Sequence, residues 1–96
     1  MPKVELIVSA TAAERKANEL SAKLQAMLTP THAEPGCEFY RLYKSERTGS
    51  FFFHELWESE EALDAHRKAP HFLQLKQATQ NLLAKPLEGH KVKQLS

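Results

Sequence analysis

Two aromatic-rich segments joined by a short polar connection restrict the fold more than any other feature of the sequence. Residues 37–44 read CEFYRLYK, residues 51–58 read FFFHELWE, and SERTGS between them has a glycine near its end. Aromatic residues favour strands, and a short polar connection containing glycine favours a tight reversal of the chain. The sequence therefore predicts an antiparallel β-hairpin.

Alternate side chains of a strand share one face of its sheet. One face of the strand 51–58 then carries Phe51, Phe53, Glu55 and Trp57. A carboxylate among aromatic rings must be hydrogen-bonded, lie near the strand end, or face a wet cavity. Two interpretations of Glu55 stay open: it pairs with Arg41 or Lys44 across the hairpin, or it orients a histidine in a pocket.

The residues before the hairpin predict a strand and a helix. The run VELIV at 4–8 is rich in β-branched residues, and Thr11 to Glu14 has the pattern of a capping box. Apolar residues then recur at helical spacing as far as Leu28, and Pro30 is expected to end the helix. Residues 29–36 are a predicted loop, with Pro35-Gly36 as its turn.

After the hairpin, Ser59 is the expected N-cap of a second helix. Pro70 suits the first turn of a helix better than its interior, so two helical pieces are predicted, 59–68 and 70–84. A last strand is expected over 90–95, with Val92 facing inward and the lysines at 91 and 93 facing outward.

The predicted order is β-α-β-β-α-β, which is the ferredoxin-like α+β arrangement of an antiparallel sheet with helices on one face. Ninety-six residues form a single domain, residues 1–96. The other sheet face would expose aromatic residues, and large exposed apolar patches are uncommon on monomers. We therefore expect a homodimer in which a second copy of the sheet covers that face.

Composition argues against several classes of partner. Thirteen basic and twelve acidic residues leave a formal charge of +1, which gives no general attraction to nucleic acid or to an anionic membrane. The lone Cys37 cannot form a disulfide within the chain. The apolar run near the N-terminus is too short for a signal peptide or a membrane span. A cytoplasmic protein is expected.

Two histidines flank the predicted helix break. His66 lies beside the inward stripe of the first piece, and His71 stands in the first turn of the second, where the helix dipole disfavours a proton on imidazole. A neutral imidazole near pH 7 suits a general base. The two are five residues apart across Pro70, unlike the i,i+4 spacing of helical metal ligands, so neither a metal nor another cofactor is predicted.

These residues resemble a known family. The pattern Pro35-Gly36-Cys37-x-x-Tyr40, Phe51-x-x-x-Glu55-x-Trp57-Glu58-Ser59-x-Glu61-Ala62-Leu63-x-x-His66 and Pro70-His71-Phe72 is similar to that of the antibiotic biosynthesis monooxygenase (ABM) domain family. The resemblance implies a homodimeric α+β barrel with one pocket in each subunit. Its members include cofactor-independent oxygenases of quinols or polycyclic hydroxyaromatics, haem-degrading enzymes, and an isomerase of a phosphorylated signalling sugar.

The resemblance implies that six residues belong to the pocket: Tyr40, Glu55, Trp57, His66, His71 and Phe72. Haem degradation is disfavoured: the predicted first strand has no asparagine, His66 stands where that branch has a tryptophan, and Lys76 lies near the place of the haem-ligating histidine.

The leading hypothesis is a monooxygenase that oxidises a quinol or hydroxyaromatic small molecule with O2 and uses no cofactor. Its expected catalytic residues are His66, His71, Tyr40 and Glu55, and its expected substrate-binding residues are Trp57, Phe72, Phe51 and Phe53. One alternative is an isomerase of a small carbonyl compound, with Arg41, Arg67 or Lys68 near any phosphate. The other is a non-catalytic dimer that binds a small ligand.

Overall fold

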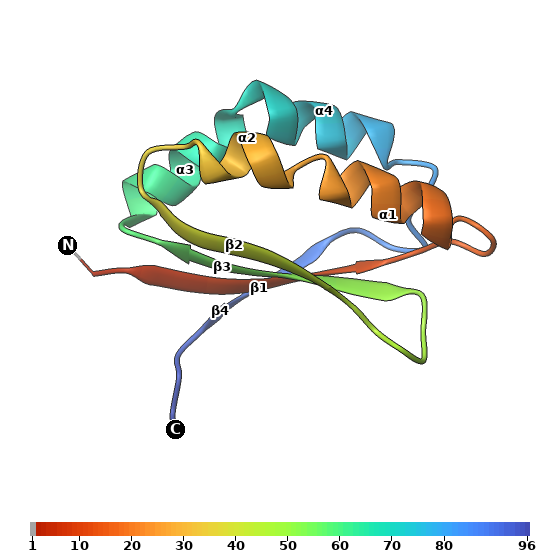
Figure 1. The fold of residues 1–96 in the computed structure, drawn as a ribbon, viewed down its shortest axis with the longest axis horizontal. Coiled ribbons are helices and arrows are strands. Elements are labelled where there is room, and N and C mark those ends of the chain that lie inside the picture. The colour runs from red at the N-terminus through yellow and green to blue at the C-terminus, as the bar shows by residue number, and fades with distance from the viewer. Residues whose placement is uncertain (1) are drawn as a thin grey trace.

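The computed structural model describes residues 2–96. The elements are β1 (Val4–Thr11), α1 (Ala17–Gln25), α2 (Leu28–His32), β2 (Cys37–Lys44), β3 (Ser50–Trp57), α3 (Glu60–Lys68), α4 (Pro70–Ala78) and β4 (Glu88–Val92). The four strands form one antiparallel sheet in the order β2-β3-β1-β4, and all four helices lie on one face of it (Figure 1). This confirms the ferredoxin-like α+β fold. Within the described residues no helix has the length and apolar character needed to cross a membrane.

The predicted hairpin is present as β2 and β3. Tyr40 lies opposite Glu55 and Leu42 opposite Phe53, and the register shifts by one residue between Cys37 and Phe39. The predicted division of β3 into two faces is also confirmed, because Phe51, Phe53, Glu55 and Trp57 are buried and the residues between them are half-buried. β3 pairs with β1 on its other side, so it lies in the interior of the sheet.

The hydrophobic core fills the space between this face of β3 and the helices. Trp57, Leu20 and Leu24 are fully enclosed, and Leu63 of α3 packs into the same cluster. The opposite sheet face carries no helix (Figure 1). We call it the open face; on it lie Glu5, Ile7, Phe39, Arg41, Tyr43, Phe52, His54, Leu56 and Val92.

The predicted capping box at Thr11 is wrong. β1 continues to Thr11, which pairs with Ser50, and its carbonyl accepts a hydrogen bond from the Ala84 N–H. The backbone around Thr11 is therefore hydrogen-bonded within the sheet and to Ala84, and it does not begin a helix. α1 begins only at Ala17, after Arg15 adopts a φ of 66°, and its N-cap residue Lys16 makes no side-chain cap.

Both long predicted helices are shorter than expected. The first ends at Gln25, and a separate helix, α2, covers Leu28–His32, so the prediction of a loop over residues 29–32 is wrong. Pro30 lies in the first turn of α2 instead of ending a helix, because its missing N–H leaves no helical bond unmade there. The last helix ends at Ala78 rather than at 84, and the hydroxyl of Thr79 donates to the Leu75 carbonyl at 2.7 Å. Residues 79–84 then return to β1, with Leu83 bridged to Ala12.

The predicted final strand was displaced and its faces were reversed. β4 covers Glu88–Val92, and Val92 lies opposite Glu5 on the open face. Lys91 lies opposite Leu6 and forms an ion pair with Glu60 of α3. A lysine on the helix side is tolerated here because its long side chain reaches a carboxylate at the rim of the helix layer.

The N-termini of the last two helices were predicted correctly. The Ser59 hydroxyl accepts a hydrogen bond from the Ala62 N–H at 3.2 Å and so caps α3, and α4 begins at Pro70.

The predicted turn at Pro35-Gly36 is built closely against α3. Gly36 has a φ of +85°, and its carbonyl accepts from the Glu58 N–H at 2.8 Å. A Cβ on Gly36 would lie 2.6 Å from the Cβ of Ala62. Both the backbone conformation and the close approach therefore require glycine.

Gly36→Ala should lower the free energy of unfolding by about 2 to 4 kcal/mol, through the left-handed backbone and the overlap with Ala62. Gly49→Ala is the matched control, because its Cβ would lie 3.5 Å from the Cβ of Ala12, an ordinary contact. Urea denaturation followed by circular dichroism measures both variants. Equal stability of the two would contradict this account of the turn.

Candidate functional site

A cavity of about 650 Å³ lies between the helices and the sheet. Its walls come from β1, β2, β3, α3, α4 and the segment before β4, and include Leu6, Val8, Tyr40, Phe53, Leu63, Phe72, Leu75, Leu83 and Leu87. The polar groups in the wall include Glu55, His66, Arg67, Lys76 and Lys85. A cavity of this size with apolar walls and a few polar groups is typical of a site for a small organic molecule.

The predicted pocket residues divide into two groups. Five of them line the cavity: Tyr40, Phe53, Glu55, His66 and Phe72. The other three do not: Trp57 and Phe51 belong to the enclosed core, and His71 turns toward Glu34. Trp57 and Phe51, both predicted to contact a substrate, are instead packed in the hydrophobic core beside the cavity.

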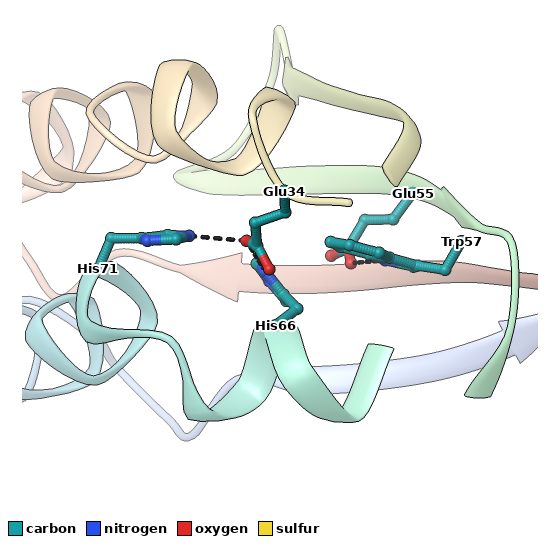
Figure 2. A network of polar contacts seen from close by, with 5 residues as sticks. All are labelled: Glu34, Glu55, Trp57, His66 and His71. Carbon is teal, nitrogen blue, oxygen red and sulfur yellow. Dashed lines mark hydrogen bonds and ion pairs between the residues drawn. The ribbon is translucent and has the colours of Figure 1, made fainter. Parts of the chain in front are cut away.

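Glu34 joins the two histidines. Its Oε2 lies 2.6 Å from Nδ1 of His66 and 2.7 Å from Nε2 of His71. Figure 2 shows the carboxylate of Glu34 between the two rings, with His66 on α3 and His71 at the start of α4. Side-chain exposure is 2% for His66, 12% for Glu34 and 22% for His71, so the cluster is nearly enclosed and opens toward solvent at His71.

The bond to Glu34 fixes the proton positions. A carboxylate oxygen only accepts, so each ring donates from the nitrogen that faces Glu34. In neutral His66 the proton is therefore on Nδ1, and Nε2 carries a lone pair. This Nε2 is buried, and no hydrogen-bond partner reaches it from residues 2–96. His66 thus has one nitrogen held by a carboxylate and a second nitrogen available as a proton acceptor.

Aromatic rings surround His66. The ring centroids of Trp57, Phe72 and Tyr40 lie 4.6, 5.1 and 5.6 Å from that of His66. Burial among these rings lowers the pKa of His66 below its ordinary value, and the hydrogen bond to Glu34 opposes this shift. The ring is accordingly neutral near pH 7, as a general base requires.

Glu55 follows neither of the two interpretations drawn from the sequence. Its Oε1 accepts a hydrogen bond from Nε1 of Trp57 at 2.9 Å, on the same face of β3 (Figure 2). Arg41 instead stacks over Phe39 on the open face, with its Cζ 4.1 Å from the ring centroid. Burial raises the pKa of the Glu55 carboxyl to about 7, and the bond from Trp57 offsets part of that rise. The cavity wall thus holds a carboxyl that titrates near neutrality.

Tyr40 is one of the residues that line the cavity. Its ring stacks on Phe53 with centroids 4.7 Å apart, and it is 3% exposed. Burial, and then the nearby Glu55 carboxyl, raise the pKa of the Tyr40 phenol. The phenol therefore keeps its proton and is a hydrogen-bond donor at neutral pH.

Sequence reasoning missed Glu34. It lies in the loop between α2 and β2, and nothing in its spacing relates it to His66 or His71. Glu34 lies two residues before Gly36, whose turn lies against Ala62 of α3, and this contact is not apparent from the sequence. Only the packing of that turn on the helix places a carboxylate beside both histidines.

The sequence from residue 4 to residue 78 matches the family described as "Antibiotic biosynthesis monooxygenase". The chain belongs to this family. The match includes both histidines, Glu34 and every residue of the β2–β3 hairpin.

The chain is also similar to two curated proteins and to two solved structures. Rv0793 of Mycobacterium tuberculosis is 44% identical over 68 residues, which are 71% of this chain and 67% of that protein. The protein sll1783 of Synechocystis is 39% identical over 74 residues, which are 76% of this chain but only 50% of that protein.

The structure of Rv0793 superimposes with a TM-score of 0.91 at 35% identity, covering 99% of this chain and 97% of that one. The structure of PA3566 from Pseudomonas aeruginosa has a TM-score of 0.92 at 29% identity, covering 100% and 97%. The ABM fold therefore extends over the whole described chain.

The raised pKa of Glu55 makes stability depend on pH. Folding raises this pKa from 4.5 to about 7, so the native state binds the proton more tightly and loses stability as the pH rises between these values. Glu55→Gln keeps an acceptor for Trp57 and removes the titration. Between pH 5 and pH 8 the wild type should lose up to about 3 kcal/mol relative to this variant.

The measurement is the urea unfolding free energy of both proteins at several pH values. Glu46→Gln, at an exposed position in the β2–β3 connection, is the matched control and should follow the wild-type profile. A Glu55→Gln profile parallel to the wild type would show that this carboxyl titrates normally.

Proposed function

We propose that this protein is a monooxygenase that oxidises a quinol or another hydroxyaromatic small molecule with O2, without a metal or an organic cofactor. The observation that carries the proposal is His66. Its Nδ1 is held by Glu34 at 2.6 Å, its Nε2 has no partner among the described residues, and it forms part of an apolar cavity of about 650 Å³. Membership of the ABM family supports the reaction class.

The first step is removal of a phenolic proton by Nε2 of His66. Glu34 stabilises the imidazolium that forms, as an ion pair across the same short hydrogen bond. Nε2 is covered by its neighbours, so a wall residue must move to admit the substrate. Phe72 is the best placed, since it is half-buried, lines the cavity and lies 5.1 Å from His66 between ring centroids.

The resulting phenolate is electron-rich enough to reduce O2. A hydroxyanthrone would react as its phenol tautomer, in which one methylene hydrogen has become the phenolic proton that His66 removes. Two electrons of the anion then form a carbon–oxygen bond between that ring carbon and O2, and the proton held on His66 converts the resulting peroxide into a hydroperoxide. Its O–O bond then breaks as that carbon loses its remaining hydrogen as a proton. One oxygen atom becomes a carbonyl and the other leaves as water, so one ring methylene and one dioxygen molecule give one ring carbonyl and one water molecule.

Three wall groups suit the charges in these steps. Tyr40, which lines the cavity, would donate its hydroxyl proton in a hydrogen bond to the developing peroxide or carbonyl oxygen. Arg67 lines the cavity and would stabilise the phenolate. Glu55, with a pKa of about 7, is suited to supply the proton for the departing water. We assign His71 a positioning role through Glu34.

A second candidate has one observation in its favour. Arg67, Lys76 and Lys85 all line the cavity, so their positive charges would favour binding of an anionic group such as a phosphate. Of the cations considered in the sequence, Arg41 and Lys68 do not line it. The same histidine would then move protons in the isomerisation of a phosphorylated carbonyl compound. This reaction needs no O2 and would proceed under nitrogen.

We further propose that two chains associate through the open face. That face presents Ile7, Phe39, Phe52 and Leu56, which are only half-buried in the single chain, and Tyr43, which is 50% exposed. The C-terminal segment leaves β4 on the same side, away from the helices (Figure 1), and its Leu95 is 92% exposed. A second sheet would cover these apolar groups.

We also propose that the protein is located in the cytoplasm, where its free cysteine, Cys37, would stay reduced.

His66→Asn tests the reaction. Asparagine can still donate to Glu34 from its amide, but it has no counterpart of the Nε2 lone pair. We expect O2 uptake with a panel of reduced quinols and hydroxyanthrones to fall at least about 100-fold in kcat, the contribution of a general base. An oxygen electrode measures uptake above autoxidation.

His32→Gln is the histidine control, because His32 does not line the cavity and glutamine can preserve its bond to the Tyr40 carbonyl. Unchanged uptake in His66→Asn would reject His66 as the base. Wild-type protein that consumes no O2 but converts phosphorylated carbonyl compounds under nitrogen would favour the isomerase.

Phe52→Glu tests the dimer. A carboxylate in the middle of the open face would be buried in the proposed interface, so the variant should be monomeric at concentrations where the wild type is dimeric. Leu73→Glu, on α4 and 53% exposed, is the control and should remain dimeric. Light scattering coupled to size exclusion gives the masses. A monomeric wild type would refute the proposed interface.

A further inference from the structure

The cluster that positions His66 has the composition of a metal site. One nitrogen of His66, one nitrogen of His71 and a carboxylate oxygen of Glu34 all lie within 4.8 Å of one another. Two imidazoles and one carboxylate are a ligand set that divalent first-row transition metals accept. We propose that Glu34, His66 and His71 bind one divalent transition-metal ion, of the class of Zn²⁺, Co²⁺ or Fe²⁺.

The distances allow an ion after a small rearrangement. Metal–ligand bonds of about 2.0 to 2.2 Å place the ligand atoms of such a site roughly 3 to 3.5 Å apart. Oε2 of Glu34 now lies 2.6 and 2.7 Å from the two nitrogens. To bind an ion, each of these two oxygen–nitrogen distances must therefore increase by less than about 1 Å. Each neutral ring moves its proton to its other nitrogen, so both rings stay uncharged as ligands.

Three separate elements hold the ligands in place. Glu34 precedes the turn at Gly36, which is locked against α3, and His66 lies in the last turn of α3. His71 is the second residue of α4, after the break at Pro70. The remaining positions around the ion would be left to water, because the described residues bring only three ligands together.

The site is accessible to a hydrated ion. His66 is 2% exposed in its side chain but His71 is 22% exposed, so the ion can arrive from the His71 side without crossing the substrate cavity. Neither Glu34 nor His71 lines that cavity. The ion would thus lie behind His66 as seen from the cavity, in contact with solvent rather than with the substrate.

Metal binding would change which nitrogen of His66 carries the proton. With Nδ1 on the ion, Nε2 carries the proton and is a donor instead of an acceptor. If the proposed function is correct, the metal-loaded protein is therefore inactive as a base, and the cation is an inhibitor. This last expectation rests on the proposed function, but the site itself does not.

A Co²⁺ titration of the tag-free, chelator-treated protein tests the site without any substrate. We expect visible ligand-field absorption to saturate at one Co²⁺ per chain and to be reversed by competing Zn²⁺. His71→Ala should raise the Co²⁺ dissociation constant at least about 100-fold, since it removes one of three ligands. Zn²⁺ should raise the melting temperature of the wild type and not that of this variant.

His54→Ala is the matched control. His54 and Glu5 form another histidine–carboxylate pair, with Nε2 and Oε2 2.6 Å apart, but among the described residues they have no third ligand. This variant should bind Co²⁺ within about 2-fold of the wild type. If His71→Ala unfolds, Glu34→Gln replaces it, because glutamine keeps a hydrogen-bond acceptor and is a poor metal ligand.

Absence of saturable absorption, or equal Co²⁺ binding by wild type and His71→Ala, would overturn the proposal. Failure of the site and failure of the proposed function remain separate results. O2 uptake is assayed in chelator, where the metal plays no part, whereas the Co²⁺ titration contains no substrate.

Discussion

The pleat of β3 is the constraint from which the site follows. β3 is paired on both sides, and every second side chain must enter the space beneath the helices. Three of these four side chains are aromatic and form the core, but the fourth is Glu55. Its carboxyl is kept within the apolar layer by the indole N–H of Trp57, two residues along the same face. A polar group is therefore fixed at the cavity wall by the same alternation that builds the core.

A second polar arrangement is built on the helix layer and depends on the loop that precedes β2. The Gly36 turn brings Glu34 to α3, and the break at Pro70 lets His71 reach the same oxygen as His66. The two carboxylates have different partners and different consequences. Glu34 is shared by two imidazoles and defines which nitrogen of His66 is free, whereas burial keeps Glu55 protonated up to about neutral pH.

Patterns local in the sequence predicted most of the fold. The hairpin, the face of β3, the Ser59 cap and the Pro70 break each depend on residues only a few positions apart. The prediction failed where distant pairing overrode local preference: Thr11 joins β3 instead of capping a helix, and Val92 faces away from the helices because its register is set by Glu5. For the candidate site, His66, Tyr40 and Glu55 were recognisable, but Glu34 was not, because 32 residues separate it from His66.

The helix break at Pro70 restricts how the chain length can vary between the two histidines. In an α-helix each added residue turns the following side chains by about 100° and advances them by about 1.5 Å. One inserted residue between His66 and His71 would therefore swing the second imidazole away from Glu34 even if both side chains were retained. The β2–β3 connection carries no such requirement. Among close relatives that share this cluster, length variation should thus be absent from residues 67–70.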